Sequence, residues 1–254
     1  MELFDLAGKV SVVTGASSGL GVQFAKALAR QGADLAIVAR RAEKLEGLSK
    51  EINSMGRRCM AVKCDVTIES EIKAAVERIV DEYGKIDILV NNAGVAEVSP
   101  AEQHTNEQWD RVLDTNLKGV FIFARETGKI MIRQKYGRVI NITSMYGHIA
   151  NTVSSNVSYH ASKGAVVNLT RALAAEWAKH NITVNAIGPG FFASEMTEGL
   201  VEDKQFVDFV KFRCPAGRVG KPGELDGALV YLASDASSYT TGQTIFVDGG
   251  WTAV

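Results

Sequence analysis

The stretch VSVVTGASSGLG, from Val10 to Gly21, decides the fold of this chain. A short β-rich run leads into a glycine-rich turn, and an apolar helical pattern follows over residues 22–31. Glycine permits a tight turn and lets the backbone approach a pyrophosphate closely, while the following helix offers free N–H groups and a positive dipole end. The stretch therefore predicts a nucleotide-binding loop at the first β–α turn of an α/β sheet.

The same alternation of β-rich runs and helical patterns continues along the chain. We expect strands over 10–13, 34–39, 59–64, 88–90, 138–142, 183–187 and 244–247, and helices over 22–31, 43–55, 69–83, 106–133, 159–180 and 224–234. Most connections are short, and no linker or repeat divides the chain. This pattern predicts one domain over residues 1–254, with a Rossmann-like, doubly wound parallel sheet of about seven strands and helices on both faces.

Composition excludes several function classes. The 254 residues are 46% hydrophobic and carry a net charge of −1, so we expect no nucleic-acid partner and no membrane partner. The start of the chain, MELFDL, has no leader-like pattern, and no apolar run is long enough to span a bilayer. Cys59, Cys64 and Cys214 form no metal-like cluster, so we expect no metal and a cytoplasmic protein with reduced thiols.

Residues 191–223 interrupt the alternation between the last two expected strands. Phenylalanines recur among polar residues there. A long insertion beside the carboxyl edge of a sheet often covers a binding site, so we expect a substrate lid. A simple pair of surface helices is the alternative.

The residues after the second expected strand bear on the choice of cofactor. An NAD site usually has a carboxylate there for the ribose 2′-hydroxyl, whereas an arginine suits a 2′-phosphate. This chain has Ala39 followed by Arg40 and Arg41, which favours NADP(H) while leaving NAD(H) possible. We expect Arg40 first, with Arg41 as a second candidate, to pair with the 2′-phosphate. Solvated surface charge is the alternative for the arginines. After the third strand, Asp65 and Val66 are expected at the adenine edge, although Asp65 alternatively caps the next helix.

Tyr159 and Lys163 stand four residues apart in an expected helix, and so share one face. A free tyrosine has a pKa of about 10, and a nearby ammonium favours the phenolate. The pair is therefore a candidate proton-transfer device for an alcohol or a carbonyl. Taken alone it is weak evidence, because such a spacing also arises by chance.

Together these residues resemble the short-chain dehydrogenase/reductase family, in its single-domain branch, from about Lys9 to the C-terminus. The resemblance rests on Thr14-Gly15-x-x-x-Gly19-x-Gly21, Asn91-Asn92-Ala93-Gly94, Asn116, Ser144, Tyr159-x-x-x-Lys163, Pro189-Gly190 and Val247-Asp248-Gly249-Gly250. It implies that the cofactor is bound by Gly15, Ser17, Ser18, Gly19, Leu20, Gly21, Arg40, Arg41, Asp65, Val66, Asn91, Asn92, Gly94, Tyr159, Lys163, Pro189, Gly190, Phe192 and Ser194.

The resemblance also implies a catalytic set. Tyr159 would be the general acid/base, and Lys163 would lower its pKa and hold the nicotinamide ribose. Ser144 would hydrogen-bond the substrate oxygen, and Asn116 would anchor a water that joins Lys163 to solvent. Two structural readings compete: Ser144 is an ordinary serine at a strand end, and Asn116 caps or kinks its helix. Other hydroxyls compete with Ser144, namely Thr143, Ser154, Ser155 and Ser158.

Two departures from the family pattern concern the pocket. Ser144 lies fifteen residues before Tyr159 rather than about thirteen, which indicates a two-residue insertion within 148–158. Ser194 stands where many relatives have threonine, and a hydroxyl for the carboxamide remains. The expected substrate walls are Ala96, Met145, Tyr146, His148, Asn151, Phe191, Phe192 and Met196.

The expected function is an NADP(H)-preferring oxidoreductase that moves a hydride between nicotinamide and a secondary alcohol or ketone. The pattern is most similar to sugar-acid and polyol dehydrogenases, with 3-oxoacyl thioester reductases nearly as close and hydroxysteroid dehydrogenases not excluded. Nucleotide-sugar epimerases share the Tyr/Lys pair but have a differently spaced glycine loop. A non-catalytic nucleotide-binding scaffold is the alternative of another class. The family resemblance also implies a homotetramer.

Overall fold

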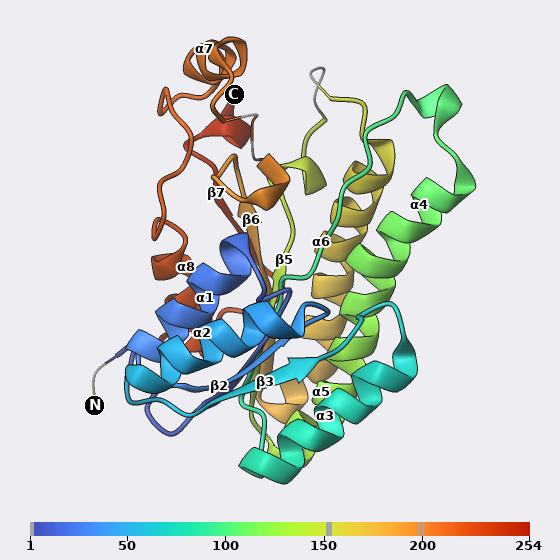
Figure 1. The fold of residues 1–254 in the computed structure, drawn as a ribbon. Coiled ribbons are helices and arrows are strands. Elements are labelled where there is room, and N and C mark those ends of the chain that lie inside the picture. Colours follow the sequence, from blue (N-terminus) through green and yellow to red (C-terminus); the bar gives the residue numbers. More distant parts are fainter. Residues whose placement is uncertain (1–2, 151–153, 198, 200) are drawn as a thin grey trace.

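The computed structural model describes residues 3–150, 154–197, 199 and 201–254. Its centre is one seven-stranded sheet in which every neighbouring pair is parallel, in the order β3-β2-β1-β4-β5-β6-β7 (Figure 1). The strands are β1 Val10–Thr14, β2 Asp34–Ala39, β3 Cys59–Lys63, β4 Ile88–Asn91, β5 Gly137–Ile142, β6 Ile182–Pro189 and β7 Thr244–Val247. The predicted fold class and the seven strand positions are confirmed, with strand ends that agree to within two residues.

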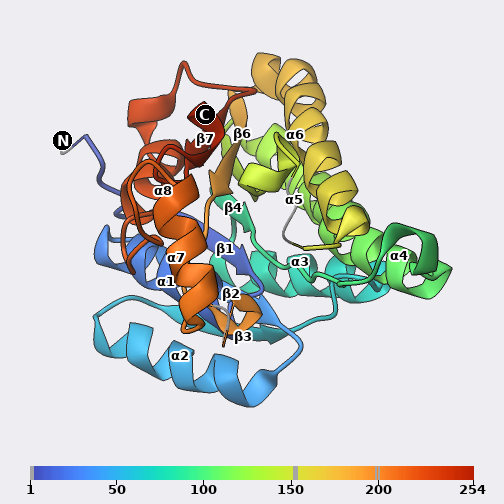
Figure 2. The same cartoon turned by 90° about the horizontal axis from the view of Figure 1, so that it is seen from above.

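Helices cover both faces of the sheet (Figures 1 and 2). They are α1 Gly19–Arg30, α2 Ala42–Ser54, α3 Glu69–Tyr83, α4 Asn106–Leu113, α5 Gly119–Gln134, α6 Val157–Trp177, α7 Lys204–Arg213 and α8 Asp226–Ala233. Within the described ranges, no helix is both long enough and apolar enough to cross a membrane.

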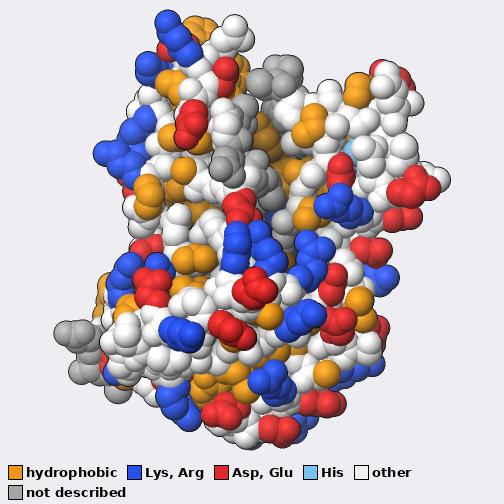
Figure 3. Space-filling model, in the orientation of Figure 1, with side chains coloured by type: hydrophobic (Ala, Val, Ile, Leu, Met, Phe, Trp, Pro, Cys, Tyr) orange, Lys and Arg blue, Asp and Glu red, His pale blue; other side chains and the backbone are white. Residues whose placement is uncertain are grey.

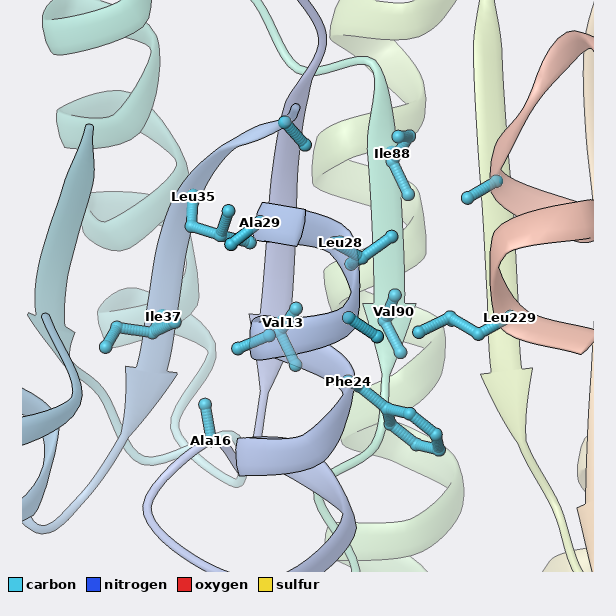
Figure 4. Close-up of a cluster of buried hydrophobic side chains, with 14 of the residues drawn as sticks. Val13, Ala16, Phe24, Leu28, Ala29, Leu35, Ile37, Ile88, Val90 and Leu229 are labelled. Atoms are coloured by element: carbon cyan, nitrogen blue, oxygen red, sulfur yellow. The ribbon is translucent and has the colours of Figure 1, made fainter. Parts of the chain in front are cut away.

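Alternate strand residues build two separate cores. Val13 and Ile37 pack with α1, α2 and α8 on one face (Figure 4), whereas Val12 and Val38 pack with α3, α5 and α6 on the other. Successive strand side chains point to opposite faces, so one apolar run such as β1 serves both cores. This two-sided burial explains why the strands read as continuous hydrophobic runs rather than as alternating ones.

The predicted helix over 106–133 is confirmed, and it contains a widened turn that the sequence pattern did not indicate. Residues Asp114–Lys118 form a π-helical turn between α4 and α5. Gly119 follows this turn, and a Cβ built there would lie only 2.6 Å from the carbonyl oxygen of Val66. The helix thus passes close to the loop after β3, and the local widening places Asn116 in the interior, where its side chain is buried.

Residues 191–223 lie beside the carboxyl edge of the sheet and include α7. Phe206 and Val210 of α7 pack with Met145, Tyr146 and Trp251 in a third apolar cluster. Phe192 pairs with Gly220 through an isolated parallel bridge, so the two ends of the segment meet. The segment and the C-terminus therefore share one aromatic core above the sheet.

Candidate functional site

A cavity of about 720 Å³ opens at the carboxyl ends of the strands. This volume falls within the range of about 300–1,000 Å³ that is usual for ligand pockets. The cavity spans the topological switch point between β1 and β4. From β1 the chain builds the sheet toward β3, and from β4 it builds the sheet toward β7. Open α/β sheets bind their ligands at such a point. Among the predicted site residues, its lining includes Gly15, Ser17, Ser18, Gly19, Leu20, Arg40, Arg41, Asp65, Val66, Asn92, Gly94, Ser144, Tyr159, Lys163, Pro189, Gly190, Phe192 and Ser194.

The glycine-rich loop is held against the end of β4 by hydrogen bonds. Thr14 Oγ1 accepts from the backbone N–H groups of Asn92 at 3.0 Å and Ala93 at 3.1 Å, and Asn92 Nδ2 donates to the Thr14 carbonyl at 3.0 Å. Gly15 has φ +66, and a Cβ there would lie 2.8 Å from Ala93 Cα. Only glycine therefore allows the loop to lie this close to β4.

The first turn of α1 is suited to bind an anion. Ser18 is its N-cap residue and makes no side-chain capping bond within the described part of the chain. The first N–H groups of a helix lack partners inside the helix, and its dipole is positive at this end. A pyrophosphate at this loop would meet both, so the residues present fit a dinucleotide.

Two predicted cofactor residues lie behind the cavity rather than in its wall. Asn91 is buried and donates to Asn141 Oδ1 at 3.0 Å, so it braces β4 against β5. A Cβ on Gly21 would lie 2.3 Å from the Gly15 carbonyl oxygen, so this glycine lets the loop pack on its own helix. The expectation that Asn91 lines the cleft is wrong, because its side chain is taken up between strands.

The two arginines after β2 differ in their surroundings. Arg41 donates to Ser17 Oγ at 3.1 and 3.0 Å and to Ser18 Oγ at 2.8 Å. Arg40 is 67% exposed, and its nearest carboxylate oxygen, on Asp65, is 3.9 Å away. Arg41 is thus held by hydrogen bonds against the glycine-rich loop, whereas Arg40 lies at the rim of the cavity.

Asp65 lies in the cavity wall but does not cap the helix, as one alternative had it. Its Oδ1 accepts from the backbone N–H of Thr67 at 2.9 Å and from Thr67 Oγ1 at 2.8 Å. The N-cap of α3 is Ile68. Asp65 therefore closes a turn that comes before the helix.

Ser144, Tyr159 and Lys163 converge on one side of the cavity. The Ser144 side chain is hydrogen-bonded to the phenol of Tyr159 and accepts from the Tyr146 N–H at 3.2 Å. Lys163 is buried, and its Nζ lies 5.6 Å from the centre of the Tyr159 ring and donates to the Ile142 carbonyl at 2.8 Å. Ser144, one of the competing hydroxyls, is thus placed on the phenol.

Burial dominates the protonation of this group. Desolvation raises the pKa of Tyr159, while the hydrogen bond from Ser144 opposes that rise. Desolvation also lowers the pKa of Lys163 to about 8. Lys163 Nζ is bonded to a backbone carbonyl in this arrangement, so the expected lowering of the tyrosine pKa by the lysine stays a prediction. A phenol that stays protonated at neutral pH is suited to donate a proton to a carbonyl oxygen.

Asn116 and Lys163 approach each other across Gly94. Asn116 Oδ1 accepts from the Val95 N–H at 2.8 Å, and its Nδ2 donates to the Val95 carbonyl at 2.9 Å and to Ser162 Oγ at 3.1 Å. A Cβ on Gly94 would lie 3.3 Å from Asn116 Oδ1 and 3.5 Å from Lys163 Nζ. Asn116 itself is not part of the cavity lining, so it would act on Lys163 from behind.

The predicted substrate walls are only partly reproduced. Ala96, Met145, Tyr146, Phe191 and Phe192 line the cavity. His148 does not, since it packs on Phe246 at 5.3 Å between ring centres, on another face. Asn151 and the side chain of Met196 lie outside the described part.

Sequence reasoning missed several lining residues, namely Val98, Asn156, Glu195, Thr197 and Phe206. Glu195 and Thr197 follow the predicted Ser194 directly, and Thr197 Oγ1 hydrogen-bonds Ser194 Oγ at 3.2 Å. Their nearness to Ser194 was the available signal. Sequence spacing alone could not show which side chains they contact across the cleft.

Comparison with known proteins places this geometry among oxidoreductases. Residues 15–252 match the family model described as enoyl-(acyl carrier protein) reductase. The chain is 40% identical to gluconate 5-dehydrogenase of Gluconobacter oxydans, over 99% of this chain and 97% of that one. It is 42% identical to 2-dehydro-3-deoxy-D-gluconate 5-dehydrogenase of Dickeya dadantii, over 100% and 99%.

A solved structure extends the likeness to three dimensions. The crystal structure of a gluconate 5-dehydrogenase from Burkholderia cenocepacia, in complex with NADP and tartrate, superposes with a TM-score of 0.96 at 37% identity. The alignment covers 100% of this chain and 98% of that one. The likeness therefore extends over the whole domain, including the cavity edge of the sheet.

Proposed function

Because this chain belongs to the short-chain dehydrogenase/reductase family and is an oxidoreductase acting on CH–OH groups, we propose that it interconverts a sugar-acid or polyol ketone and its alcohol with NADP(H). The observation that carries the proposal is the convergence of Ser144, Tyr159 and Lys163 on one side of a dinucleotide-sized cavity. The whole chain would form a single domain, with residues 191–223 as a lid over the substrate.

The reacting groups have complementary tasks in this proposal. When bound, the nicotinamide exchanges a hydride with the substrate carbon. Tyr159 gives its phenolic proton to the carbonyl oxygen in reduction and takes it back in oxidation, so one C–H and one O–H bond form or break together. Ser144 holds the same oxygen, and Lys163 binds the cofactor ribose. Asn116 and Lys163 would pass the replacement proton to the phenol through water near Gly94.

NADP(H) is the preferred cofactor of this proposal. Arg41 stands beside the glycine-rich loop and Arg40 at its rim, and Ala39 places no carboxylate at the end of β2. An arginine fork binds a phosphate with two parallel hydrogen bonds. Solved relatives carry NADP, which supports the same choice.

The substrate choice rests on the cavity wall and on the names of the relatives. Tyr146, Ser154 and Asn156 supply neutral polar groups near Tyr159, as a polyhydroxy substrate requires. We expect kcat/KM with NADPH to be highest for 5-ketogluconate when it is compared with an acetoacetyl thioester and a ketosteroid. Absorbance of the reduced nicotinamide measures the rates. A hundredfold preference for the thioester or the steroid would overturn the sugar-acid assignment and leave the oxidoreductase intact.

We also propose a homotetramer. Large apolar side chains stand at the surface of neighbouring helices: Trp109 on α4 is 39% exposed, and Phe121 on α5 and Val157 on α6 are 40% exposed. Light scattering is expected to give about four times the 27.3 kDa mass of the chain. Phe121→Asp should give smaller species, whereas Phe212→Asp on α7 should not. A wild-type mass of one chain at micromolar concentration would refute the assembly.

A cytoplasmic location is the remaining part of the proposal. Cys59, Cys64 and Cys214 are free thiols, and reduced cysteines are usual in a reducing compartment. Burial raises the pKa of Cys59 to about 11 and, with help from nearby carboxylates, that of Cys64 to about 12, so both stay unreactive.

A further inference from the structure

The Glu195 carboxylate is paired with cationic side chains that would otherwise bind the 2′-phosphate of the proposed cofactor. Its carboxylate accepts two parallel hydrogen bonds from Arg41, at 3.1 Å from Nη1 and 2.8 Å from Nη2, and a third from Lys44 Nζ at 2.7 Å. The Ser18 hydroxyl also hydrogen-bonds it. Figure 3 shows Lys and Arg side chains gathered with acidic ones near the centre of this face of the molecule.

This arrangement is an anion site already filled by the chain itself. A carboxylate and a phosphate both accept the planar fork of an arginine, with similar geometry. The site lies at the end of β2 and beside the glycine-rich loop, where Rossmann-type folds accommodate a 2′-phosphate. The side chains of Arg41 and Glu195 are both 45% exposed, so a ligand can reach the pair from solvent.

The charges of this cluster indicate that a phosphate would replace Glu195 rather than bind beside it. Arg41 and Lys44 together carry two positive charges, and a phosphate monoester carries about −1.5 to −2 at pH 7. With Glu195 in place the cluster is left with one net positive charge and a carboxylate facing the incoming phosphate. Interactions with Arg41 and Lys44 lower the pKa of Glu195 to about 2, so the carboxylate stays charged at any working pH.

We propose that Glu195 competes with the 2′-phosphate of NADP(H) for Arg41 and Lys44, and is released when the cofactor binds. This inference rests on the proposed function. It makes Glu195 a specificity-determining residue and Lys44 a further phosphate-binding residue. Because Glu195 begins the turn Glu195–Thr197 after β6, the same exchange detaches one end of the 191–223 segment from the cofactor site.

The dinucleotide without the extra phosphate meets the site differently. NAD(H) brings no anion to Arg41, so it can bind while Glu195 keeps its contacts. Loss of the Glu195 charge should therefore change the affinity for NADP(H) and leave that for NAD(H) nearly unaltered. This difference separates competition from a general loosening of the segment, which would affect both dinucleotides.

The test is calorimetric titration of the full chain with NADP⁺ and with NAD⁺ at one fixed ionic strength. Glu195→Gln should tighten NADP⁺ binding about three- to tenfold, as expected for the loss of two exposed ion pairs, and should keep NAD⁺ within about twofold. Lys44→Ala should weaken NADP⁺ alone. The control Glu43→Gln removes a charge from the exposed first turn of α2, next to Lys44, and should leave both affinities unchanged.

A double-mutant cycle isolates the contact between Arg41 and Glu195. In an Arg41→Ala background, Glu195→Gln should lose most of its effect on NADP⁺, because the main contested group is gone. Weaker NADP⁺ binding by Glu195→Gln, unchanged binding, or equal tightening of both dinucleotides would overturn the competition. A wild-type chain that binds neither dinucleotide would overturn the proposed function together with this inference, whereas failure of the variant alone leaves the function standing.

Discussion

Tyr159→Phe is expected to lower kcat by about 10²–10⁴-fold, the usual contribution of a general acid–base group. The change deletes the phenolic proton and the hydrogen bond to Ser144 while keeping the ring that lines the cavity. Burial raises the pKa of this phenol, so wild-type Tyr159 enters the reduction with its proton in place. Steady-state reduction of the ketone, followed through the absorbance of NADPH, measures the loss.

Tyr146→Phe provides the matched control for this prediction. Tyr146 is a second tyrosine of the same cavity, its side chain is buried, and its ring stacks on His160 at 4.6 Å between centres. Loss of its hydroxyl removes a proposed substrate contact but no reacting proton, so it should raise KM for the ketone and leave most of kcat. In Tyr159→Phe, the affinity for NADP⁺ and the melting temperature should change little. Near-normal kcat in Tyr159→Phe would remove the phenol from the mechanism.

Arg41→Ala is expected to weaken NADPH binding by one to two decades and NADH binding much less. Hydrogen bonds to charged groups contribute about 1.5–3 kcal/mol, and a decade of affinity corresponds to about 1.4 kcal/mol. Arg41 donates to both serines of the glycine-rich loop, so its guanidinium is already oriented toward the phosphate position.

Arg40→Ala is the comparison for that variant. Arg40 was the leading expectation from the sequence, yet its side chain is 67% exposed and makes only a 3.9 Å ion pair with Asp65. A flexible exposed cation binds a phosphate more weakly than one that is held in place, so the loss of NADPH affinity should be smaller than for Arg41→Ala. Fluorescence or calorimetric titration with both dinucleotides measures the two variants. Equal losses for NADPH and NADH in Arg41→Ala would show that the arginine acts through folding.

The fold and the family could be predicted from the sequence alone, and so could the side chains that we propose as catalytic. The run Val10–Gly21 joins strand, turn and helix within local sequence, and Tyr159 and Lys163 share a helix face by their spacing alone. Signals of this kind survive because backbone preference and short-range geometry act over a few residues. The order of the motifs along the chain then indicated the family, and with it the parallel sheet that carries them.

Features that depend on contacts between distant segments could not be predicted from local sequence patterns. The π-helical turn at Asp114–Lys118 lies next to Gly119, which packs closely on the loop after β3. The Asn91 side chain is held between strands by Asn141 of β5. Glu195 lies 154 residues from the arginine it holds. Burial raises the pKa of Tyr159, and the extent of that burial depends on every element packed around the phenol. Contacts across the sheet edge and desolvation are set only when the loops of separate strands come together, and no local pattern encodes that meeting.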